Sequence, residues 1–441
     1  MNDLLRPVRL VPLAFLGVMT VGALLLMLPA TRAGDGGALV WPAVFTAVAS
    51  VCITGMTIVD FPSFWTPLGQ VVVLLLVQAG GFGIMTLATL LGTLVSGKLG
   101  LRSMLTTQAE SHTAHPGDVR GLLRRVALTM LAFELVLSAV LTVRFRVAYE
   151  EDLGTALWYG VFHGVSSFNS SGYTLFDDNL VRFVGDAWMC LTISVAVVAG
   201  GIGFPVLSEL ARRTRPSRWT IHTRITVYGT LILLSLGIGG VLALEWSNPG
   251  TLGELSVADK LTAATTAGVM PRTGGFNSIS YGQVEQETLG LTMLLMFIGG
   301  GSGGTAGGIK VTTFFLLAFV IWSEIRGDDE VVVGQREVPR STQREALSIA
   351  LLGVGVVAVG GLAVMLLTDR PFEVILFETV AAFSTAGLST GITADLPRAA
   401  QAVLLVLMFV GRVGPITVAS ALALRTRQRL YRRPEERPII G

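Results

Sequence analysis

Long stretches without a charged residue set the strongest limit on how this chain folds. Residues 10–31, 187–208, 225–244, 288–309 and 346–368 contain no Asp, Glu, Lys or Arg, and residues 61–97 form a longer run of this kind. Two further apolar stretches, 126–143 and 399–424, are interrupted only by Glu134 and Arg412. Because about 20 apolar residues suffice for a helix to cross the hydrocarbon core of a bilayer, the sequence predicts eight membrane spans.

The composition supports a helical membrane protein and excludes several other classes. Of the 441 residues, 51% are hydrophobic, 14% are charged and 52 are glycine, whereas a soluble domain has about 25% charged residues and about 7% glycine. The chain is therefore neither disordered, nor collagen-like, nor a soluble enzyme with an ordinary surface. Its net charge of +2 gives no indication of a nucleic-acid partner. Cys52 and Cys190 both lie in apolar stretches, and we expect two free thiols.

Four shorter apolar segments alternate with the predicted spans. They comprise residues 36–59, 153–176, 257–271 and 371–394, and all are rich in Gly, Ser, Thr and Ala. Each holds only about a dozen helix-like residues, a length typical of re-entrant segments. We therefore expect an all-α membrane protein built from four repeats, each with two spans (M1 and M2) flanking one pore helix (P). The eight transmembrane helices and four re-entrant pore helices would surround one pore with pseudo-fourfold symmetry.

The expected repeats cover residues 8–97, 120–212, 223–325 and 343–425, followed by a C-terminal tail at 426–441. Basic residues indicate their orientation, because Lys and Arg concentrate on the cytoplasmic side of membrane proteins. The termini and the segments between repeats hold 22 Lys and Arg residues, and the opposite side holds 8. The sequence thus predicts that both termini are cytoplasmic and that all four short segments enter the membrane from outside.

The four short segments align on one glycine. They read VASVCITGMTIVD (48–60), VSSFNSSGYTLFDD (165–178), AGVMPRTGGFNSI (267–279) and VAAFSTAGLSTGI (380–392), and the aligned residues are Gly55, Gly172, Gly275 and Gly387. An apolar residue follows each glycine, and small or hydroxyl-bearing residues precede it. A triplet of this kind is common in any glycine-rich chain, but four copies at near-equal spacing on the same side of the membrane favour a functional repeat.

The repeated pattern suits the dehydration of a cation. An ion that leaves water needs replacement oxygens, which rings of backbone carbonyls supply, and glycine permits the positive φ that aims successive carbonyls at one axis. The negative C-terminal end of each short helix would add a favourable field for cations. We therefore predict a selectivity filter made of the following residues: Cys52, Ile53, Thr54, Gly55, Asn169, Ser170, Ser171, Gly172, Arg272, Thr273, Gly274, Gly275, Ser384, Thr385, Ala386 and Gly387.

The sixth span contains a second glycine-rich feature, GGGSGGTAGG. Its residues are Gly299, Gly300, Gly301, Ser302, Gly303, Gly304, Thr305, Ala306, Gly307 and Gly308. Glycine costs about 1 kcal/mol per residue inside a helix, so we expect the span to break here. Phosphate-binding motifs fail on context, because no strand precedes the segment and Ile309 occupies the place of the P-loop lysine. A simple packing hinge is one interpretation, and a flexible loop across the pore is the other, with Ser302 and Thr305 bonding across the cavity.

Two cations lie within or beside the predicted spans. Arg412 has 13 uncharged residues before it and 12 after it, which places it about 18 Å from either interface. An ion at this depth is a functional candidate by default. Lys310 follows the glycine-rich segment and would lie nearer the cytoplasm.

At these residues the chain resembles the Trk/Ktr/HKT superfamily of potassium transporters over roughly residues 8–441. The filter-like motifs CITG, HGVSSFNSSGY, RTGGFN and FSTAGL carry the resemblance, together with GGGSGGTAGGIK and FVGRVGP. Within the superfamily the chain is most similar to the KtrB group of membrane subunits, on account of its early first repeat and its C-terminal EERPIIG. Glycine in all four loops resembles the potassium-selective members.

The resemblance implies uptake of K⁺ across the plasma membrane. It implies backbone carbonyl ligands for K⁺ at Thr54, Gly55, Ser171, Gly172, Gly274, Gly275, Ala386 and Gly387. It further implies that residues 299–308 form an intramembrane gating loop and that Arg412 acts as an electrostatic barrier below the filter, with Lys310 assigned to the same gate. The expected partners are a second copy of the chain, membrane lipid, and a cytoplasmic nucleotide-binding ring of RCK domains of the KtrA type. Na⁺ is a candidate activator, and the chain itself is expected to bind no cofactor.

Two other function classes were weighed against ion uptake. A secondary transporter of another solute also uses broken helices at the membrane midplane, but it usually has two inverted halves. A membrane-embedded enzyme needs a cluster of intramembrane His, Asp or Glu. The candidates Glu134, Glu378, Lys310 and Arg412 are scattered along the sequence, and no catalytic motif occurs, so we expect no enzymatic activity.

Overall fold

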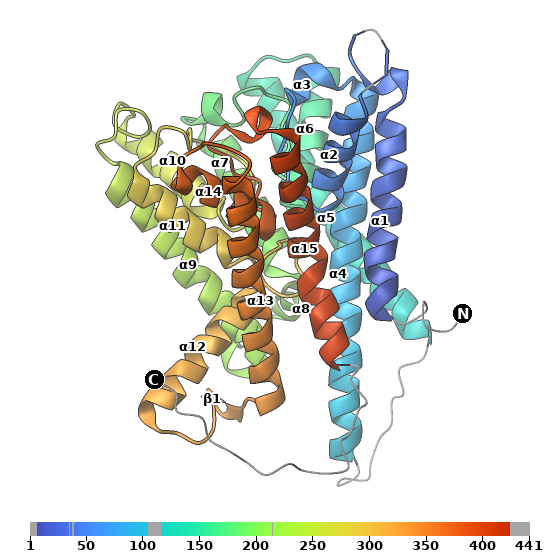
Figure 1. Ribbon diagram of the computed structural model, residues 1–441, viewed down its shortest axis with the longest axis vertical. Coiled ribbons are helices and arrows are strands. Elements are labelled where there is room, and N and C mark those ends of the chain that lie inside the picture. Colours follow the sequence, from blue (N-terminus) through green and yellow to red (C-terminus); the bar gives the residue numbers. More distant parts are fainter. Residues whose placement is uncertain (1–6, 35, 38, 105–115, 214, 424–441) are drawn as a thin grey trace.

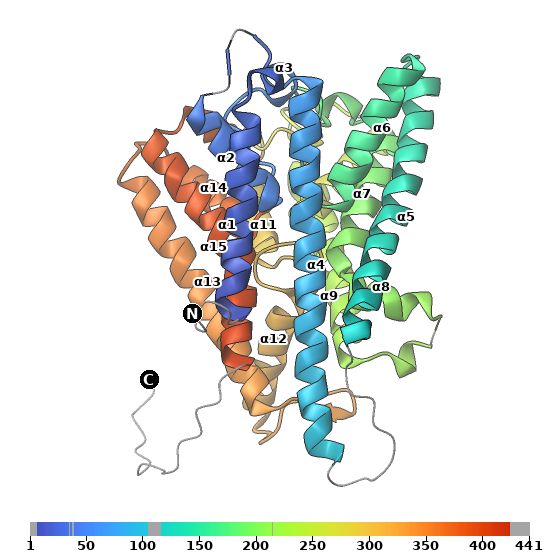
Figure 2. The ribbon, with the colours of Figure 1, turned by 90° about the vertical axis from the view of Figure 1, so that its right-hand side faces the viewer.

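The computed structural model describes residues 7–34, 36–37, 39–104, 116–213 and 215–423. The expected C-terminal tail at 426–441 lies outside these residues. Several long helices run roughly vertically in Figure 1, whereas others are tilted, and four shorter helices lie among them in the upper half. Figure 2 shows that α4 (Pro67–Met104) runs along the full height of the bundle, whereas α1 (Pro7–Leu26) and α5 (Pro116–Ala148) end higher up.

Helices make up almost all the regular structure of the described residues. The helices within the expected spans are α1 (Pro7–Leu26), α4 (Pro67–Met104), α5 (Pro116–Ala148), α7 (Ala187–Ile202), α9 (Ile221–Glu245), α11 (Gln286–Phe297), α12 (Val311–Arg326), α13 (Arg340–Met365) and α15 (Arg398–Ala423). The four short inner helices are α2 (Val40–Val51), α6 (Leu153–Phe168), α10 (Val257–Val269) and α14 (Phe372–Ser384), and α3 (Phe61–Phe64) and α8 (Phe204–Ala211) are shorter connections. A small antiparallel hairpin, β1 (Val332–Val333) and β2 (Arg336–Glu337), joins α12 to α13.

Side-chain caps start several of these helices where the sequence places Asp, Ser or Thr. The Asp152 carboxylate accepts hydrogen bonds from the backbone N–H groups of Gly154 and Thr155, 2.9 and 3.1 Å away, at the start of α6. Asp186 caps α7 in the same way, and Ser256 caps α10. Such caps satisfy the N–H groups that a helix leaves free at its start, and each contributes about 1 kcal/mol.

The outward faces of the long helices are strongly apolar. On α5, Leu131, Leu135 and Val136 are exposed, and α13 exposes Leu351 and Val359 among others. Soluble monomers rarely expose contiguous apolar patches larger than a few hundred Å². These faces therefore fit contact with lipid, and the chain is a multi-pass helical membrane protein.

Among the described residues, five helical segments are long and apolar enough to cross a membrane. They are Pro67–Leu90, Arg120–Ala148, Ile221–Glu245, Arg340–Met365 and Arg398–Pro415, and α7 with α8 adds a sixth if the two count as one bent span. The first expected span, α1, contributes the apolar stretch Val11–Leu26. The sixth expected span is divided for a physical reason, because residues 298–310, which include the glycine-rich segment, are not helical.

The expected span at 187–208 is also not straight. Its two helices meet at 101° after Ile202. Gly203 takes a φ of +100°, and a Cβ there would lie 2.7 Å from the carbonyl oxygen of Ser302. The N–H of Phe204 donates to the Gly303 carbonyl over 3.1 Å. The bend thus makes room for the glycine-rich segment of another span, which a single-span hydropathy pattern does not reveal.

Small residues allow α6 to pack closely against α5. Gly160 and Gly164, four residues apart, lie on one face of α6, opposite Ser138 and Thr142 of α5. A Cβ at Gly160 would approach the Thr142 hydroxyl to 2.1 Å and the Ser138 carbonyl oxygen to 2.7 Å. This spacing is a known device of helix pairs in membranes, where small residues let two backbones approach.

We predict that Gly160→Ala destabilises the folded protein by about 1–3 kcal/mol, the usual effect of overpacking. The matched control is Gly239→Ala on α9, because a Cβ there has no neighbour within 4 Å. The control should be neutral or stabilising, since Ala favours helix over Gly by about 1 kcal/mol. The melting temperatures of the purified variants in detergent decide this, and equal values for both would contradict the proposed packing.

Candidate ion pathway

Each short inner helix ends in a turn with the same backbone shape. A residue with positive φ stands two positions before the aligned glycine, which itself has positive φ. The residues two positions before the glycines, with their φ values, are Ile53 (56°), Ser170 (59°), Thr273 (65°) and Thr385 (51°). The φ values of the glycines are 73° at Gly55, 73° at Gly172, 75° at Gly275 and 76° at Gly387. A left-handed non-glycine residue costs about 1–3 kcal/mol and persists only where its surroundings enforce it.

Hydrogen bonds back to the preceding helix hold these turns. The N–H groups of Thr54, Ser171 and Ala386 donate to the carbonyls five residues earlier, over 2.8, 2.9 and 2.9 Å. This is the bond pattern that closes a helix with a left-handed residue. The third loop differs, because Gly274 N–H reaches the carbonyl of Met270, four residues earlier, over 2.8 Å.

The four aligned glycines meet in a closed ring. A Cβ added at Gly55 would lie 1.8 Å from Ser171 O, and one added at Gly172 would lie 2.6 Å from Gly275 Cα. A Cβ added at Gly275 would lie 3.1 Å from Ala386 O, and one added at Gly387 would lie 1.8 Å from Thr54 O. Each loop thus touches the next one in chain order, and the fourth touches the first. The ring brings together from four distant parts of the chain the residues that the alignment singled out.

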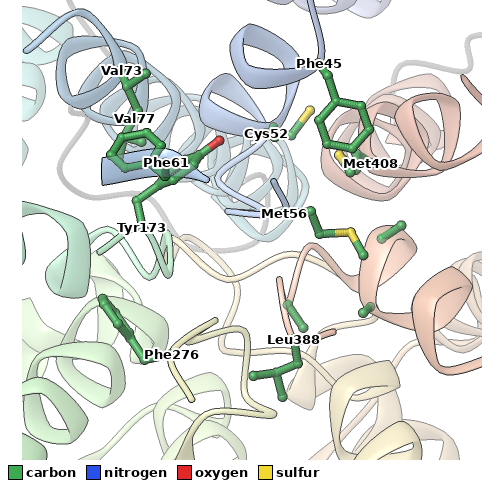
Figure 3. Packing of buried hydrophobic residues seen from close by; sticks show 14 of the residues in the cluster. Phe45, Cys52, Met56, Phe61, Val73, Val77, Tyr173, Phe276, Leu388 and Met408 are labelled. Atoms are coloured by element: carbon green, nitrogen blue, oxygen red, sulfur yellow. The ribbon is translucent and has the colours of Figure 1, made fainter. Parts of the chain in front are cut away.

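The apolar residues after the glycines surround the ring. Met56, Tyr173, Phe276 and Leu388 are all buried and belong to one hydrophobic cluster. Figure 3 shows them around a common centre, each on a different loop, with Phe61 beside Tyr173. The ring centroids of Phe61 and Tyr173 are 4.9 Å apart. This apolar packing fixes the loops from outside, so that backbone atoms remain at the centre.

Several buried hydroxyls in the loops have no hydrogen-bond partner among the described residues. They are the Oγ1 atoms of Thr54, Thr273 and Thr385. Nearly all buried polar side chains in proteins are hydrogen-bonded, to protein or to water. These oxygens are therefore free to accept an ion or water in the pathway, next to the ring of glycines.

Side chains three positions before the glycines anchor the loops instead of lining the ring. Asn169 Nδ2 donates to Gln78 Oε1 over 2.9 Å and to Glu134 Oε1 over 3.0 Å. Glu134 therefore faces the interior of the bundle, where Gln78 Nε2 also donates to it over 3.1 Å. Arg272 Nη2 donates to Gly299 O over 2.7 Å. Ser384 Oγ donates to Val380 O within its own helix, and Cys52 is buried as a free thiol.

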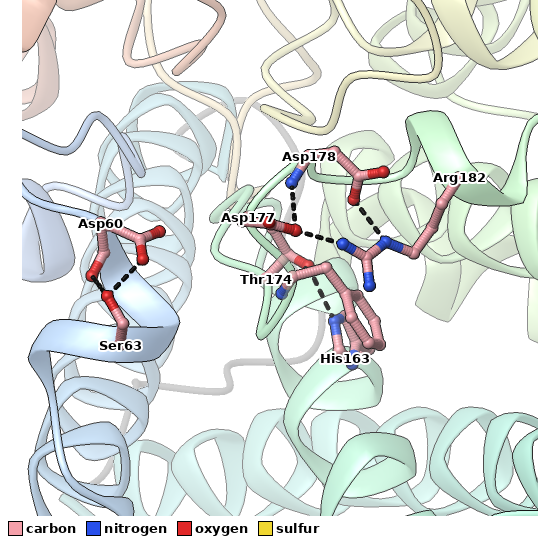
Figure 4. A network of polar contacts seen from close by, with 8 residues as sticks. Asp60, Ser63, His163, Thr174, Asp177, Asp178 and Arg182 are labelled. Atoms are coloured by element: carbon pink, nitrogen blue, oxygen red, sulfur yellow. Dashed lines mark hydrogen bonds and ion pairs between the residues drawn. The ribbon is translucent and has the colours of Figure 1, made fainter.

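Two further anchors act on the outer ends of the loops. Glu378 of α14 accepts hydrogen bonds from Ser389 Oγ over 2.6 Å, from Thr390 N–H over 2.9 Å and from Thr393 Oγ1 over 2.8 Å. In the second loop, His163 Nδ1 donates to the carbonyl of Tyr159, and Nε2 accepts from Thr174 Oγ1 over 3.1 Å (Figure 4). Gln78 and Thr393 belong to no recurring motif, so no sequence signal marks them as anchors.

A cavity of about 210 Å³ opens on the outer side of the ring. Its lining includes Gly55, Gly172, Asp60 and Asp177. Figure 4 shows Asp60 bonded to Ser63, and Asp177 and Asp178 facing Arg182. The carboxylates place negative charge beside the entrance, and Arg182 offsets part of it.

The glycine-rich segment forms a loop whose two ends, residues 299–300 and 309–311, are joined by hydrogen bonds, and we call this junction the neck of the loop. Gly299 N–H donates to Ile309 O over 2.7 Å, and Val311 N–H donates to Gly300 O over 3.0 Å. The rest of the loop bonds to α7, because Gly301 N–H reaches Gly201 O over 2.8 Å. Several backbone polar groups of this non-helical segment thus find partners within the protein, as non-helical backbone at membrane depth requires.

The loop lies directly against the proposed filter turns. Thr305 Oγ1 is 3.1 Å from Ser170 Oγ, in hydrogen-bond contact. A Cβ at Gly307 would meet the Thr385 hydroxyl at 2.1 Å. Ser302 does not bond across the cavity as expected, because its Oγ pairs with Thr312 Oγ1 at the start of α12, 3.0 Å away.

Three cationic side chains donate to carbonyls of this loop. Arg412, 2% exposed on α15, donates to Thr305 O. Lys310 Nζ donates to Ala306 O, and Arg272 holds Gly299 O. Among the described residues, no group of three or more His, Cys, Asp or Glu has the arrangement of a metal site. The chemistry of the centre is therefore that of backbone oxygens with cations behind them.

Known proteins share both the sequence and the fold of this chain. Residues 29–430 match the TrkH family model, described as a cation transport protein. The chain is 36% identical to Ktr system potassium uptake protein B of Bacillus subtilis (strain 168), over 99% of this chain and 97% of that protein. It is 34% identical to the protein of the same name from Vibrio alginolyticus, over 98% and 94%.

Two more distant relatives extend the comparison. The potassium/sodium uptake protein NtpJ of Enterococcus hirae is 31% identical, over 99% of this chain and 98% of that protein. The crystal structure of the potassium transporter TrkH from Vibrio parahaemolyticus superimposes with a TM-score of 0.71 at 18% identity, covering 94% of this chain and 84% of that one. The structural likeness shows the fold, and the sequence matches show the family. The chain belongs to the TrkH family of cation transport proteins.

Proposed function

We propose that this protein takes up K⁺ through a pore at the centre of its four loops. The observation that carries the proposal is the closed ring of four left-handed glycines in which each loop touches the next. A ring of this kind brings backbone from four loops to one axis, the geometry that an ion needs in order to exchange its water shell for carbonyl oxygens. The relatives named as potassium uptake proteins support K⁺ as the ion.

In this proposal each repeat is an M1-P-M2 unit, with α2, α6, α10 and α14 as pore helices. The repeats cover residues 8–97, 120–212, 223–325 and 343–425. The filter consists of residues 52–55, 169–172, 272–275 and 384–387, and the ligands of K⁺ are the backbone carbonyls of Thr54, Gly55, Ser171, Gly172, Gly274, Gly275, Ala386 and Gly387. The similar φ values of the four turns support this equivalence. The side chains of Asn169 and Arg272 serve to anchor the filter from behind.

Residues 299–308 act as the gate in this proposal. The contact of Thr305 with Ser170, and of Gly307 with Thr385, places the loop against two of the four filter turns. Arg412 restrains the loop by its bond to Thr305 O and repels cations that pass. Lys310 adds a second positive charge to the same loop.

The assembly follows from the same family membership. We propose that both termini are cytoplasmic in the plasma membrane, that the chain forms a homodimer, and that a nucleotide-binding ring of RCK domains regulates it from the cytoplasm. The word "system" in the names of two relatives supports a multi-component transporter. The name potassium/sodium uptake protein of a third supports Na⁺ as an activator or second ion.

Expression of the chain in cells that lack K⁺ uptake should restore growth at low K⁺ and produce saturable Rb⁺ uptake. The measurement is Rb⁺ uptake with and without Na⁺, and with and without candidate regulatory rings. A variant that lacks residues 299–441 serves as the inactive control. Failure of Rb⁺ uptake under all these conditions, together with accumulation of an organic solute, would favour a secondary transporter instead.

Replacement of Gly275 by Ser should weaken the discrimination of K⁺ over Na⁺ by about tenfold or more, because about 1.4 kcal/mol of lost preference corresponds to a factor of ten. The added Cβ would meet Gly172 Cα at 2.8 Å and distort the ring. Competition of Na⁺ with Rb⁺ uptake measures the effect. Gly391→Ala is the matched control, since Gly391 also has a positive φ but no neighbour within 4 Å. Unchanged selectivity in the Gly275 variant would count against a filter at this position.

Arg412→Ala should raise the basal rate of Rb⁺ uptake by roughly tenfold, the factor expected when a hydrogen bond to a charged group is removed. The loop would lose its bond at Thr305 O, and the pathway would lose a repelling charge. Arg398→Ala, an exposed arginine at the start of the same helix, is the control. The gating role would be wrong if the rate stayed unaltered both in Arg412→Ala and in a variant with a shortened 299–308 segment.

A further inference from the structure

Arg272 differs from the residues at the same position of the other three loops. It is a buried guanidinium, 5% exposed, where the other loops have Cys52, Asn169 and Ser384. Its Nη2 leaves the third filter turn and donates to the carbonyl of Gly299 over 2.7 Å. One side chain therefore connects a loop of the glycine ring to the glycine-rich segment, although the two are 27 residues apart.

The acceptor lies at the neck of the intramembrane loop. Gly299 N–H bonds to Ile309 O, so the same residue closes the neck through its N–H and binds Arg272 through its carbonyl. Arg412 holds a different point, the carbonyl of Thr305, which lies against the second filter turn. The loop is thus fixed at its neck from the third filter turn and at its far side from α15.

The surroundings of Arg272 give its charge few other partners. No carboxylate among the described residues forms an ion pair with it. Its Nε and Nη1 atoms have no protein partner, and the side chain borders a cavity of about 10 Å³ with Thr230, Leu234 and Gly201, a volume that fits one water molecule. A buried charge is costly unless it is hydrogen-bonded, so loss of the Gly299 bond would leave this cation with no direct bond to protein.

We propose that Arg272 is a positioning residue that ties the neck of the 299–308 loop to the third filter turn. Movement of the neck then pulls on residues 272–275, and a change in that turn shifts the loop. Opening of the loop and the geometry of the filter are mechanically coupled at this one bond. The inference rests on the proposed roles of the loop and the ring, but the bond itself is tested without transport.

The test measures how readily the 299–308 loop moves away from the filter turns that it contacts. Ser302 is partly exposed on the loop, and Ser302→Cys introduces a reporter thiol in the full-length chain in inside-out membrane vesicles. The rate of modification by a membrane-impermeant methanethiosulfonate reagent is compared with and without Arg272→Met. We expect modification about tenfold faster or more in the Arg272→Met variant, the factor for loss of a charge-assisted hydrogen bond. Arg272→Lys, which keeps the charge but loses the fork of donors, should give an intermediate rate.

The control removes another buried cation, on the helix that precedes the third filter turn. Lys260 of α10 is 8% exposed and donates to Trp246 O over 2.8 Å, at the opposite end of the helix from the loop. Lys260→Met should leave the modification rate unchanged. The parent chain without Ser302→Cys corrects for reaction at the buried Cys52 and Cys190.

Each outcome decides the proposal. Equal modification rates in the parent and Arg272→Met would overturn it, and so would an equal increase in Lys260→Met, which would indicate general loosening. If Arg272→Met does not reach the membrane, a parent-like rate in Arg272→Lys overturns it and a faster rate supports it. Rb⁺ uptake is then measured in the same variants. Faster modification with unchanged KM and selectivity for Rb⁺ would support the bond between Arg272 and Gly299 but reject its coupling to the filter. The two measurements therefore distinguish failure of the proposed function from failure of the bond.

Discussion

The close meeting of four backbone turns is the constraint on which the rest of the structure depends. At Gly55 and Gly387 even one methyl group would lie 1.8 Å from a carbonyl oxygen of the next loop. No side chain fits at these glycines, so backbone groups meet there. The N–H groups of Thr54, Ser171 and Ala386 donate back to their own helices, and the oxygens left beside the ring are carbonyls and the unpartnered hydroxyls of Thr54, Thr273 and Thr385. The apolar ring of Met56, Tyr173, Phe276 and Leu388 then fixes those turns from outside, as a backbone site requires when side chains do not line it.

Cationic side chains bind backbone carbonyls of the glycine-rich loop. Non-helical backbone at membrane depth must find partners within the protein, and three of the loop carbonyls find them in Arg272, Lys310 and Arg412. The same bonds give each buried cation an acceptor that carries no full negative charge. A carboxylate partner would cancel the positive charge of the side chain, whereas a carbonyl has no net charge and leaves most of the electrostatic field of the side chain in place. The loop is therefore bound by side chains whose positive charge no carboxylate partner neutralises among the described residues.

Motifs that recur along the sequence could be predicted from it, whereas contacts between segments that are distant in the sequence could not. The aligned glycines, with a small or polar residue before them, repeat four times, and that is why residue types alone predict that the four turns share one backbone shape. The bend at Gly203 has no such signal, because its cause is the Ser302 and Gly303 backbone of a different span. Arg272 was placed in the filter because it is in register with Cys52, Asn169 and Ser384. Only the structure shows that its side chain turns to Gly299, since the direction of a long side chain depends on the tertiary packing around it.

The four turns have nearly the same backbone shape but different surroundings. The second is anchored by Glu134, Gln78 and His163, the third by Arg272, and the fourth by Glu378. The span that follows the third loop is divided into α11 and α12, whereas α4 and α15 are continuous. Among the described residues, the glycine-rich loop belongs to this one divided span, and Arg272 from the third turn and Arg412 from α15 both donate to its carbonyls. The four turns therefore keep nearly the same backbone shape, while a single asymmetric segment lies against two of them.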